Sequence, residues 1–224
     1  MVFLLVVAAA AAPGDRRLAD AMKQQDPQRV RALLLQHADV NGRSEDGSTA
    51  LLWAAHWNDR QTAELLVRAG ADPNAANDLR MTPLSQACTN GSAAFVNLLL
   101  AAGANPGTSI ATGETPLMTC ARAGAADAVR ALLARGADVN ATEPTLHQTA
   151  LMWAAAERHQ KVLQALIEAK ADLDAHTKLG FTALHFAARD DLQSVQTLLG
   201  AGVDVNIRWQ PDPEPDRGAE TSGA

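Results

Sequence analysis

A seven-residue pattern returns along the chain at a nearly constant spacing. It starts at Thr49 as TALLWAA, at Thr82 as TPLSQAC, at Thr115 as TPLMTCA, at Thr149 as TALMWAA and at Thr182 as TALHFAA. The starts are 33, 33, 34 and 33 residues apart. A period of this length indicates an array of one structural unit, in which each unit buries its apolar side only against its neighbours.

Each unit carries a second element that keeps the same period. GADPN begins at Gly70, GANP at Gly103 and GADVN at Gly136, and between the two elements apolar residues recur at helical spacing, as at Val30 and Leu33. The chain is rich in Ala and Leu, with four Phe and no Tyr, which favours helices over sheets. The pattern predicts an all-α chain whose unit is helix, short turn, helix and glycine-containing turn.

The Thr-Pro-Leu-His-like opening with a period of 33 resembles the ankyrin repeat, and the resemblance runs from about Leu18 to Asn206. It implies an ankyrin-repeat solenoid of stacked helix-turn-helix units with projecting turns. In that family the Thr begins the first helix, and Pro, here Pro83 and Pro116, occupies its first turn. Glycine then closes the second helix with a left-handed backbone, a position that Lys170 takes in one unit.

We predict about six repeats within residues 13–207. Counting back from Thr49 reaches a first unit at Arg16 whose outer side is polar, as expected of a capping repeat. The last unit is one residue short between its helices, and Ser194 stands where a branched apolar residue is usual. Residues 208–224 are rich in proline and charge without periodicity, so we predict a disordered tail.

The first twelve residues, MVFLLVVAAAAA, are apolar throughout and too few to span a bilayer as a helix. Small residues followed by Pro13 and Gly14 are typical of a cleaved signal peptide, although the usual positive charges before the apolar run are missing. The alternative is a buried first helix. We therefore expect a periplasmic or secreted protein, similar to exported bacterial ankyrin-repeat proteins, with a cytoplasmic protein as the alternative.

The chain has two cysteines, Cys88 and Cys120, each in the small-residue pair of a first helix. The two occupy adjacent rather than equal positions of neighbouring units, whose helix axes we expect about 8 to 10 Å apart. We predict two buried free thiols that act as small apolar residues. A disulfide between them is the alternative.

No motif in the sequence indicates catalysis or a bound cofactor. The six histidines do not recur at one repeat position and lack the spacing of metal ligands, and no nucleophile or phosphate-loop motif occurs. We therefore expect no enzymatic activity, no cofactor and no metal site. The net charge of -6 argues against nucleic acid as a partner. We further expect a monomer with no stable membrane anchor after cleavage of the signal peptide.

In ankyrin repeats the first helices line the concave face, and the resemblance implies a protein-binding role for that face and the turn tips. The exposed positions form two aromatic zones around a polar middle. The residues predicted to bind a partner are Trp53, His56, Trp57, Gln86, Thr89, Asn90, Arg122, Trp153, Glu157, Phe186 and Arg189. The alternative for Trp53 and Trp153 is that they cover gaps between neighbouring helices.

We therefore predict a scaffold that recognises a partner protein without catalysis. The alternative is a regulatory module or a fragment of a larger assembly whose catalytic part lies on another domain or chain. A binder of small molecules or metals would need polar groups that converge in the groove, which the repeat alignment does not show.

Overall fold

The structure is a computed structural model that describes residues 14–207, so the predicted signal peptide and tail lie outside the described residues. The helices of the described part are α1 (Arg17–Lys23), α2 (Pro27–Leu35), α3 (Ala50–His56), α4 (Arg60–Arg68), α5 (Pro83–Thr89), α6 (Ala93–Ala101), α7 (Pro116–Arg122), α8 (Ala126–Ala134), α9 (Ala150–Ala156), α10 (Gln160–Glu168), α11 (Ala183–Ala187) and α12 (Leu192–Ala201).

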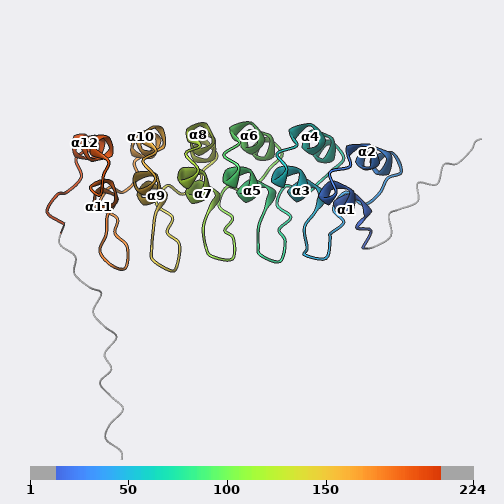
Figure 1. The fold of residues 1–224 in the computed structure, drawn as a ribbon, viewed down its shortest axis with the longest axis horizontal. Coiled ribbons are helices and arrows are strands. Elements are labelled where there is room, and N and C mark those ends of the chain that lie inside the picture. Colours follow the sequence, from blue (N-terminus) through green and yellow to red (C-terminus); the bar gives the residue numbers. More distant parts are fainter. Residues whose placement is uncertain (1–13, 208–224) are drawn as a thin grey trace, which may run out of the picture.

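The twelve helices form six helix pairs stacked side by side in chain order (Figure 1). We call the odd-numbered row the inner helices and the even-numbered row the outer helices. Five finger loops, each running from an outer helix to the next inner helix, project to one side. In residues 14–207 the only β pairing is three isolated bridges at the bases of fingers. The predicted all-α ankyrin-repeat solenoid is confirmed.

The repeated threonine begins inner helices in the way the sequence predicts. Thr49 has an extended backbone, and its Oγ1 accepts a hydrogen bond from the Leu52 amide at 3.3 Å. This bond satisfies one of the free N–H groups at the helix start. Pro83 and Pro116 are the first residues of α5 and α7, where a missing N–H removes no helical bond.

The residue that follows most outer helices has a left-handed backbone. Gly70 has a φ of 92°, and Lys170, in the equivalent position after α10, has a φ of 62°. A side chain is disfavoured in this conformation, since the left-handed region suits glycine. The predicted strain at Lys170 therefore has its cause in the backbone that the repeat requires.

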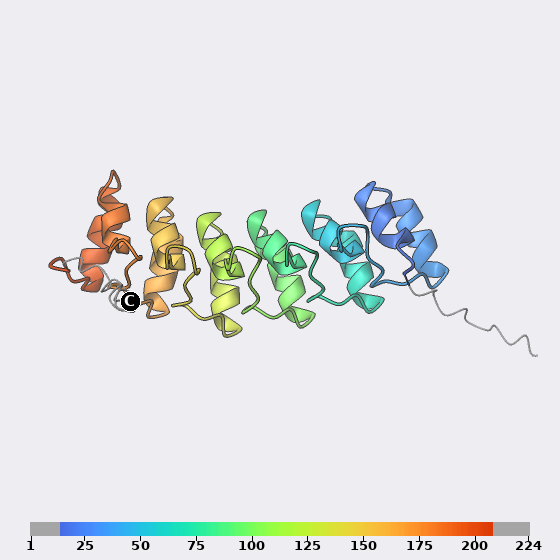
Figure 2. The ribbon, with the colours of Figure 1, turned by 90° about the horizontal axis from the view of Figure 1, so that it is seen from below.

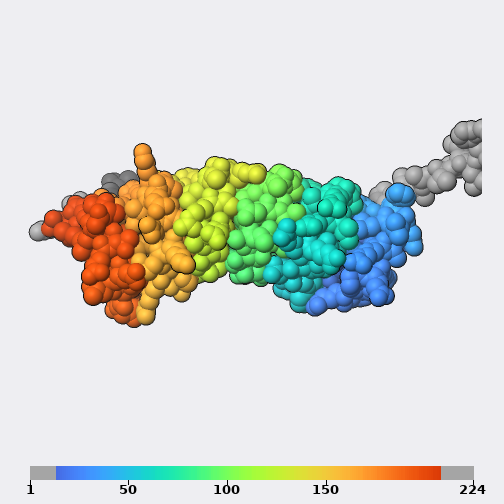
Figure 3. Space-filling model, turned by 90° about the horizontal axis from the view of Figure 1, so that it is seen from above, coloured from blue at the N-terminus to red at the C-terminus, as the bar shows by residue number. Residues whose placement is uncertain are grey.

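The core runs through the whole stack as a repeated set of leucines. Leu51, Leu84, Leu117 and Leu151 occupy the same position of successive inner helices, and all four are buried. The outer face forms bands in chain order (Figure 3), and each helix pair contacts its neighbours in the sequence. Buried apolar area, shared between adjacent units, is thus what stabilises the array.

Side chains at the finger bases also join neighbouring units. The Asn41 Oδ1 accepts a hydrogen bond from the Asp72 amide at 2.7 Å, and the Asn74 Oδ1 accepts one from the Asn105 amide at the same distance. Gly107 stands where the next asparagine would be, so that this contact is missing between the third and fourth fingers.

The two ends of the stack differ. The first unit keeps Leu18 buried and ends the stack with a polar outer side. In the last unit α11 has five residues where the other inner helices have seven, and Leu184 is only half-buried. Ser194 is buried, and its amide donates to the Asp191 side chain at 3.2 Å. It therefore begins α12 as part of a cap rather than filling apolar space.

The prediction of free thiols is wrong. Cys88 of α5 and Cys120 of α7 form a disulfide, with their Cα atoms 4.5 Å apart. Both residues are fully buried, as predicted. The expected distance between helix axes was misleading, because side chains from adjacent repeat positions point toward each other across the small residues Ala87 and Ala121. The disulfide therefore links the third and fourth units.

Candidate functional site

The exposed sides of the inner helices and the facing sides of the finger loops form a surface along the stack, which we call the inner face. Figure 2 shows this side of the molecule from below, with the units side by side. Each inner helix exposes residues four, seven and eight positions after its starting threonine. The predicted binding residues lie at these positions, so the inner face is the candidate site.

An aromatic cluster forms the part of the inner face nearest the start of the chain. The Trp53 and Trp57 rings are stacked with centroids 6.4 Å apart, and the His56 ring meets the Trp57 ring edge-on at 4.5 Å. Trp53 is half-buried, whereas Trp57 is 41 % exposed. The three residues predicted together are therefore in contact and open to solvent.

The finger in front of Trp53 carries a fixed carboxylate. Asp46 accepts hydrogen bonds from the Ser44 Oγ at 2.6 Å, the Ser48 amide at 3.2 Å and the Ser48 Oγ at 2.9 Å. Burial alone would raise the pKa of Asp46, but these hydrogen bonds outweigh it and hold that pKa below its ordinary value. The Trp53 Nε1 lies 3.5 Å from the Ser44 Oγ, which ties the ring to the same finger.

The polar middle of the inner face has mixed roles. Gln86 is half-buried, and Thr89 is exposed with its Oγ1 donating to the Ser85 carbonyl at 3.1 Å. The Asn90 Nδ2 donates to the Ala55 carbonyl at 2.8 Å, which satisfies a free carbonyl at the end of α3. Asn90 therefore joins two units, and its side chain is less available to a partner than predicted.

The second tryptophan of the inner face is covered by a neighbouring side chain. The Arg122 guanidinium lies 5.1 Å from the centre of the Trp153 ring and forms an ion pair with Glu114 at 3.0 Å. The Trp153 Nε1 is buried and has no hydrogen-bond partner among the described residues. Two predicted binding residues, Arg122 and Trp153, are thus brought together in a contact of their own.

The part of the inner face nearest the end of the described chain is again aromatic. Phe186 and Arg189 line a cavity of 360 Å³ with Phe181 and His185, and the Phe181 and Phe186 rings are 6.3 Å apart. The His185 Nδ1 accepts a hydrogen bond from the Thr182 amide at 3.2 Å, which is the structural role that the motif implies. Sequence reasoning missed Phe181, although it precedes the repeated threonine and is exposed.

The finger in front of Trp153 is built around a buried carboxylate. The Glu143 side chain accepts hydrogen bonds from the Thr145 amide at 2.6 Å, the Leu146 amide at 2.9 Å and the Gln148 amide at 2.9 Å. Burial alone would raise the pKa of Glu143, but the backbone donors outweigh it and hold that pKa below its ordinary value. The predicted site residue Glu157, in contrast, is exposed.

The fingertips carry exposed leucines that the sequence prediction named only as turn tips. Leu79, Leu146 and Leu179 stand three residues before the threonine in their fingers, apart from one residue of extra length at the finger of Leu146. Exposed apolar side chains in a row are typical of interaction surfaces. Aligning the fingers, and not only the helices, would have revealed these residues.

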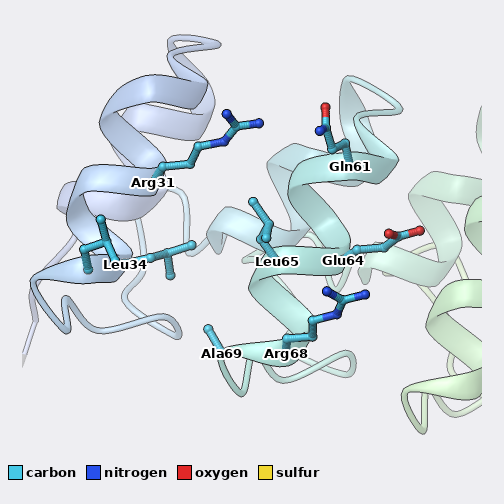
Figure 4. Close-up of a pocket in the computed structure, with 8 residues that line it drawn as sticks. Arg31, Leu34, Gln61, Glu64, Leu65, Arg68 and Ala69 are labelled. Atoms are coloured by element: carbon cyan, nitrogen blue, oxygen red, sulfur yellow. The ribbon is translucent and has the colours of Figure 1, made fainter.

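The outer face has a hollow of its own. A cavity of 640 Å³ lies between α2 and α4, where Leu34 and Leu65 point toward each other and Glu64 points away (Figure 4). Leu35 at its edge is 83 % exposed. This hollow is apolar with Arg31 and Arg68 at its margins, whereas the inner face combines rings with carboxylates.

Other kinds of site were sought in residues 14–207. No three His, Cys, Asp or Glu side chains of this part come together as a metal site requires. None of its helices is both long enough and apolar enough to cross a membrane.

Family comparison agrees with the architecture. The model for ankyrin repeats in three copies matches residues 18–109, 70–143 and 141–208. The chain belongs to the ankyrin-repeat family. Ankyrin repeats are generally scaffolds for protein interaction, and the family is typically non-catalytic. A comparison with curated proteins gave no match.

Proposed function

We propose that this ankyrin-repeat protein binds one partner protein along its inner face and fingertips and acts by binding, without catalysis. The protein would act as a monomer, and Trp53, His56 and Trp57 would form its main anchor. Repeat proteins of this kind present a long surface whose side chains vary without disturbing the core, which suits recognition.

The observation that carries this proposal is the exposure of Trp57 next to Trp53. Trp57 lies at the C-terminal end of α3, and its ring contacts His56 and Trp53 rather than the buried core. Tryptophan is enriched among the residues that dominate binding energy, because it buries a large area with few rotatable bonds. Packing within the stack does not require an exposed ring at this position, which is Ala123 in the fourth unit.

We also propose that the protein is exported to an oxidising compartment, the periplasm or the exterior. The apolar run at residues 1–12 supports this, and so does the disulfide between Cys88 and Cys120. Structural disulfides persist in such compartments and are rare in the cytosol. A bacterial source is part of the same proposal and rests on the resemblance to exported bacterial relatives.

The experiment is to replace Trp57 with alanine and to measure affinity for a partner purified from the native compartment by capture. We expect a loss of about 2 kcal/mol, roughly thirtyfold in affinity, because a central aromatic anchor would be removed. The thermal midpoint should change little, since Trp57 contributes little to the core.

Two controls separate binding from folding. Leu35→Ala removes an exposed apolar side chain from the outer face and should leave affinity unchanged. Leu51→Ala removes a buried core side chain and should cost about 2 to 5 kcal/mol of unfolding free energy. If Trp57→Ala leaves affinity unchanged, or lowers stability as much as Leu51→Ala, the proposed anchor is wrong.

A further inference from the structure

A small cavity lies beside the aromatic cluster, between the second and third units. It has a volume of 180 Å³, and its walls come from two inner helices and two fingers. The Trp53 and His56 rings form one side, Gln86 of α5 another, and Met81 and Asp46 of the fingers the rest. This volume is well below the roughly 300 to 1,000 Å³ of small-molecule pockets, so it suits a single side chain of a partner.

The charge of the cavity has one sign. Asp46 is its only acidic lining residue, and none of the described residues that line it is a lysine or arginine. A carboxylate has about four acceptor positions, and those of Asp46 are used by three donors from Ser44 and Ser48. The Asp46 carboxylate is therefore held in place with one acceptor position free. Its lowered pKa keeps it ionised in neutral and mildly acidic solution.

The ring beside this carboxylate already attracts a cation. The Lys23 Nζ, on α1, lies 5.5 Å from the centre of the Trp53 ring. The cavity lies toward the next unit, on α5, where Gln86 is half-buried and its side chain forms no hydrogen bond with the described residues. An aromatic face, a fixed carboxylate and a free amide are the groups that recognise a planar cation.

We infer that the cavity between Trp53, Asp46 and Gln86 binds the guanidinium of an arginine side chain presented by the partner protein. The guanidinium stacks on the Trp53 ring and donates to the free acceptor position of Asp46, while the aliphatic stem of the arginine lies against Met81. This inference rests on the proposed function, since it names one chemical group of the partner that the inner face would bind.

The test uses acetyl-arginine methylamide as the probe and the full chain as the receptor. The tryptophan indole N–H resonances are followed by nuclear magnetic resonance, and that of Trp53 is assigned with the Trp53→Phe variant. We expect a saturable shift of this resonance. Acetyl-citrulline methylamide has nearly the same shape without the charge, and it should bind at least about fivefold more weakly.

Three variants give the location of the bound probe. Asp46→Asn should weaken binding of the arginine probe by about fivefold. Gln86→Lys should abolish it by placing a cation in the cavity, and it leaves the hydrogen bonds of Asp46 intact if Asp46→Asn fails to fold. Asp78→Asn removes the same charge from the next fingertip, outside the cavity, and should bind as the unaltered protein does.

Equal binding of the citrulline probe, or unchanged binding by Gln86→Lys, would overturn the inference. The proposed function stands or falls separately, because it depends on the affinity of the Trp57→Ala variant for a partner. If the arginine probe fails while Trp57→Ala still loses partner affinity, the inner face binds a protein without an arginine in this cavity.

Discussion

Trp53 and Trp153 occupy the same position of two repeats, four residues after the threonine, but their surroundings differ. Trp53 stacks on an exposed second tryptophan and reaches a serine of its finger with its Nε1. Trp153 has a glutamate, Glu157, in the place of that second tryptophan, and its ring is covered by Arg122. One residue type at one repeat position therefore has two different environments.

The finger in front of each tryptophan accounts for part of this difference. Ser44 and Asp46 leave a cavity and a free acceptor position beside Trp53. Glu143 takes the position of Ser44 in the later finger, and its carboxylate is occupied by the backbone of its own loop. The comparison indicates that finger sequence, rather than helix sequence, decides whether an inner-face tryptophan faces a binding cavity.

The disulfide between the two tryptophan regions should have the largest effect on stability. It closes a loop across a sequence separation of 32 residues, which corresponds to about 3 to 4 kcal/mol of unfolding free energy in the chain-entropy account. We expect reduction, or the double variant Cys88→Ala and Cys120→Ala, to lower stability in urea unfolding by this amount. Hydrogen exchange should then show that α3 and α9 lose protection separately, because the units between them are weakened.

The double variant is also the control, since a reductant should not change its stability. Equal stability of the oxidised and reduced protein would show that the central units hold the two regions together without the bond.

Replacing Glu143 with glutamine should give the next largest effect. The variant keeps the shape but loses the charge that accepts the backbone N–H groups, so we expect a loss of about 1.5 to 3 kcal/mol at pH 7. Because the pKa of Glu143 is lowered on folding, its contribution is complete above the ordinary value and disappears as the pH falls through the lowered one. Urea unfolding from pH 7 to pH 2 should show the two proteins converging in acid.

Glu157→Gln is the matched control for this change, since it removes an exposed carboxylate from the same unit. A gap between wild type and Glu143→Gln that persists unchanged in acid would contradict the assigned role of the charge.

The smallest expected effect compares the two tryptophans directly. Trp153→Phe removes a buried N–H that has no partner among the described residues, whereas Trp53→Phe removes one that reaches Ser44. An unsatisfied buried donor is unfavourable, so Trp153→Phe should be less destabilising than Trp53→Phe by about 1 kcal/mol. Thermal unfolding of the two variants measures this difference, and the reverse order would mean that the two environments are energetically alike.

The architecture could be predicted from the sequence because it depends on local and repeated signals. The threonine caps, the helix starts at Pro83 and Pro116 and the left-handed backbone at Gly70 and Lys170 follow from residues within one unit. The period then places equivalent side chains on the same face. The aromatic cluster of Trp53, His56 and Trp57 could be predicted for the same reason, since the three residues lie on one exposed side of a single helix.

Contacts between units were decided only by the tertiary structure. The disulfide, the bond from Asn90 to the end of α3, the cover of Arg122 over Trp153 and the cavity at Asp46 all join side chains about one repeat apart or in a finger and a helix. The repeat alignment gives their order along the stack but not the separation and direction of side chains across it. Those depend on how closely small residues allow neighbouring helices to approach and on how each finger uses its own hydrogen bonds.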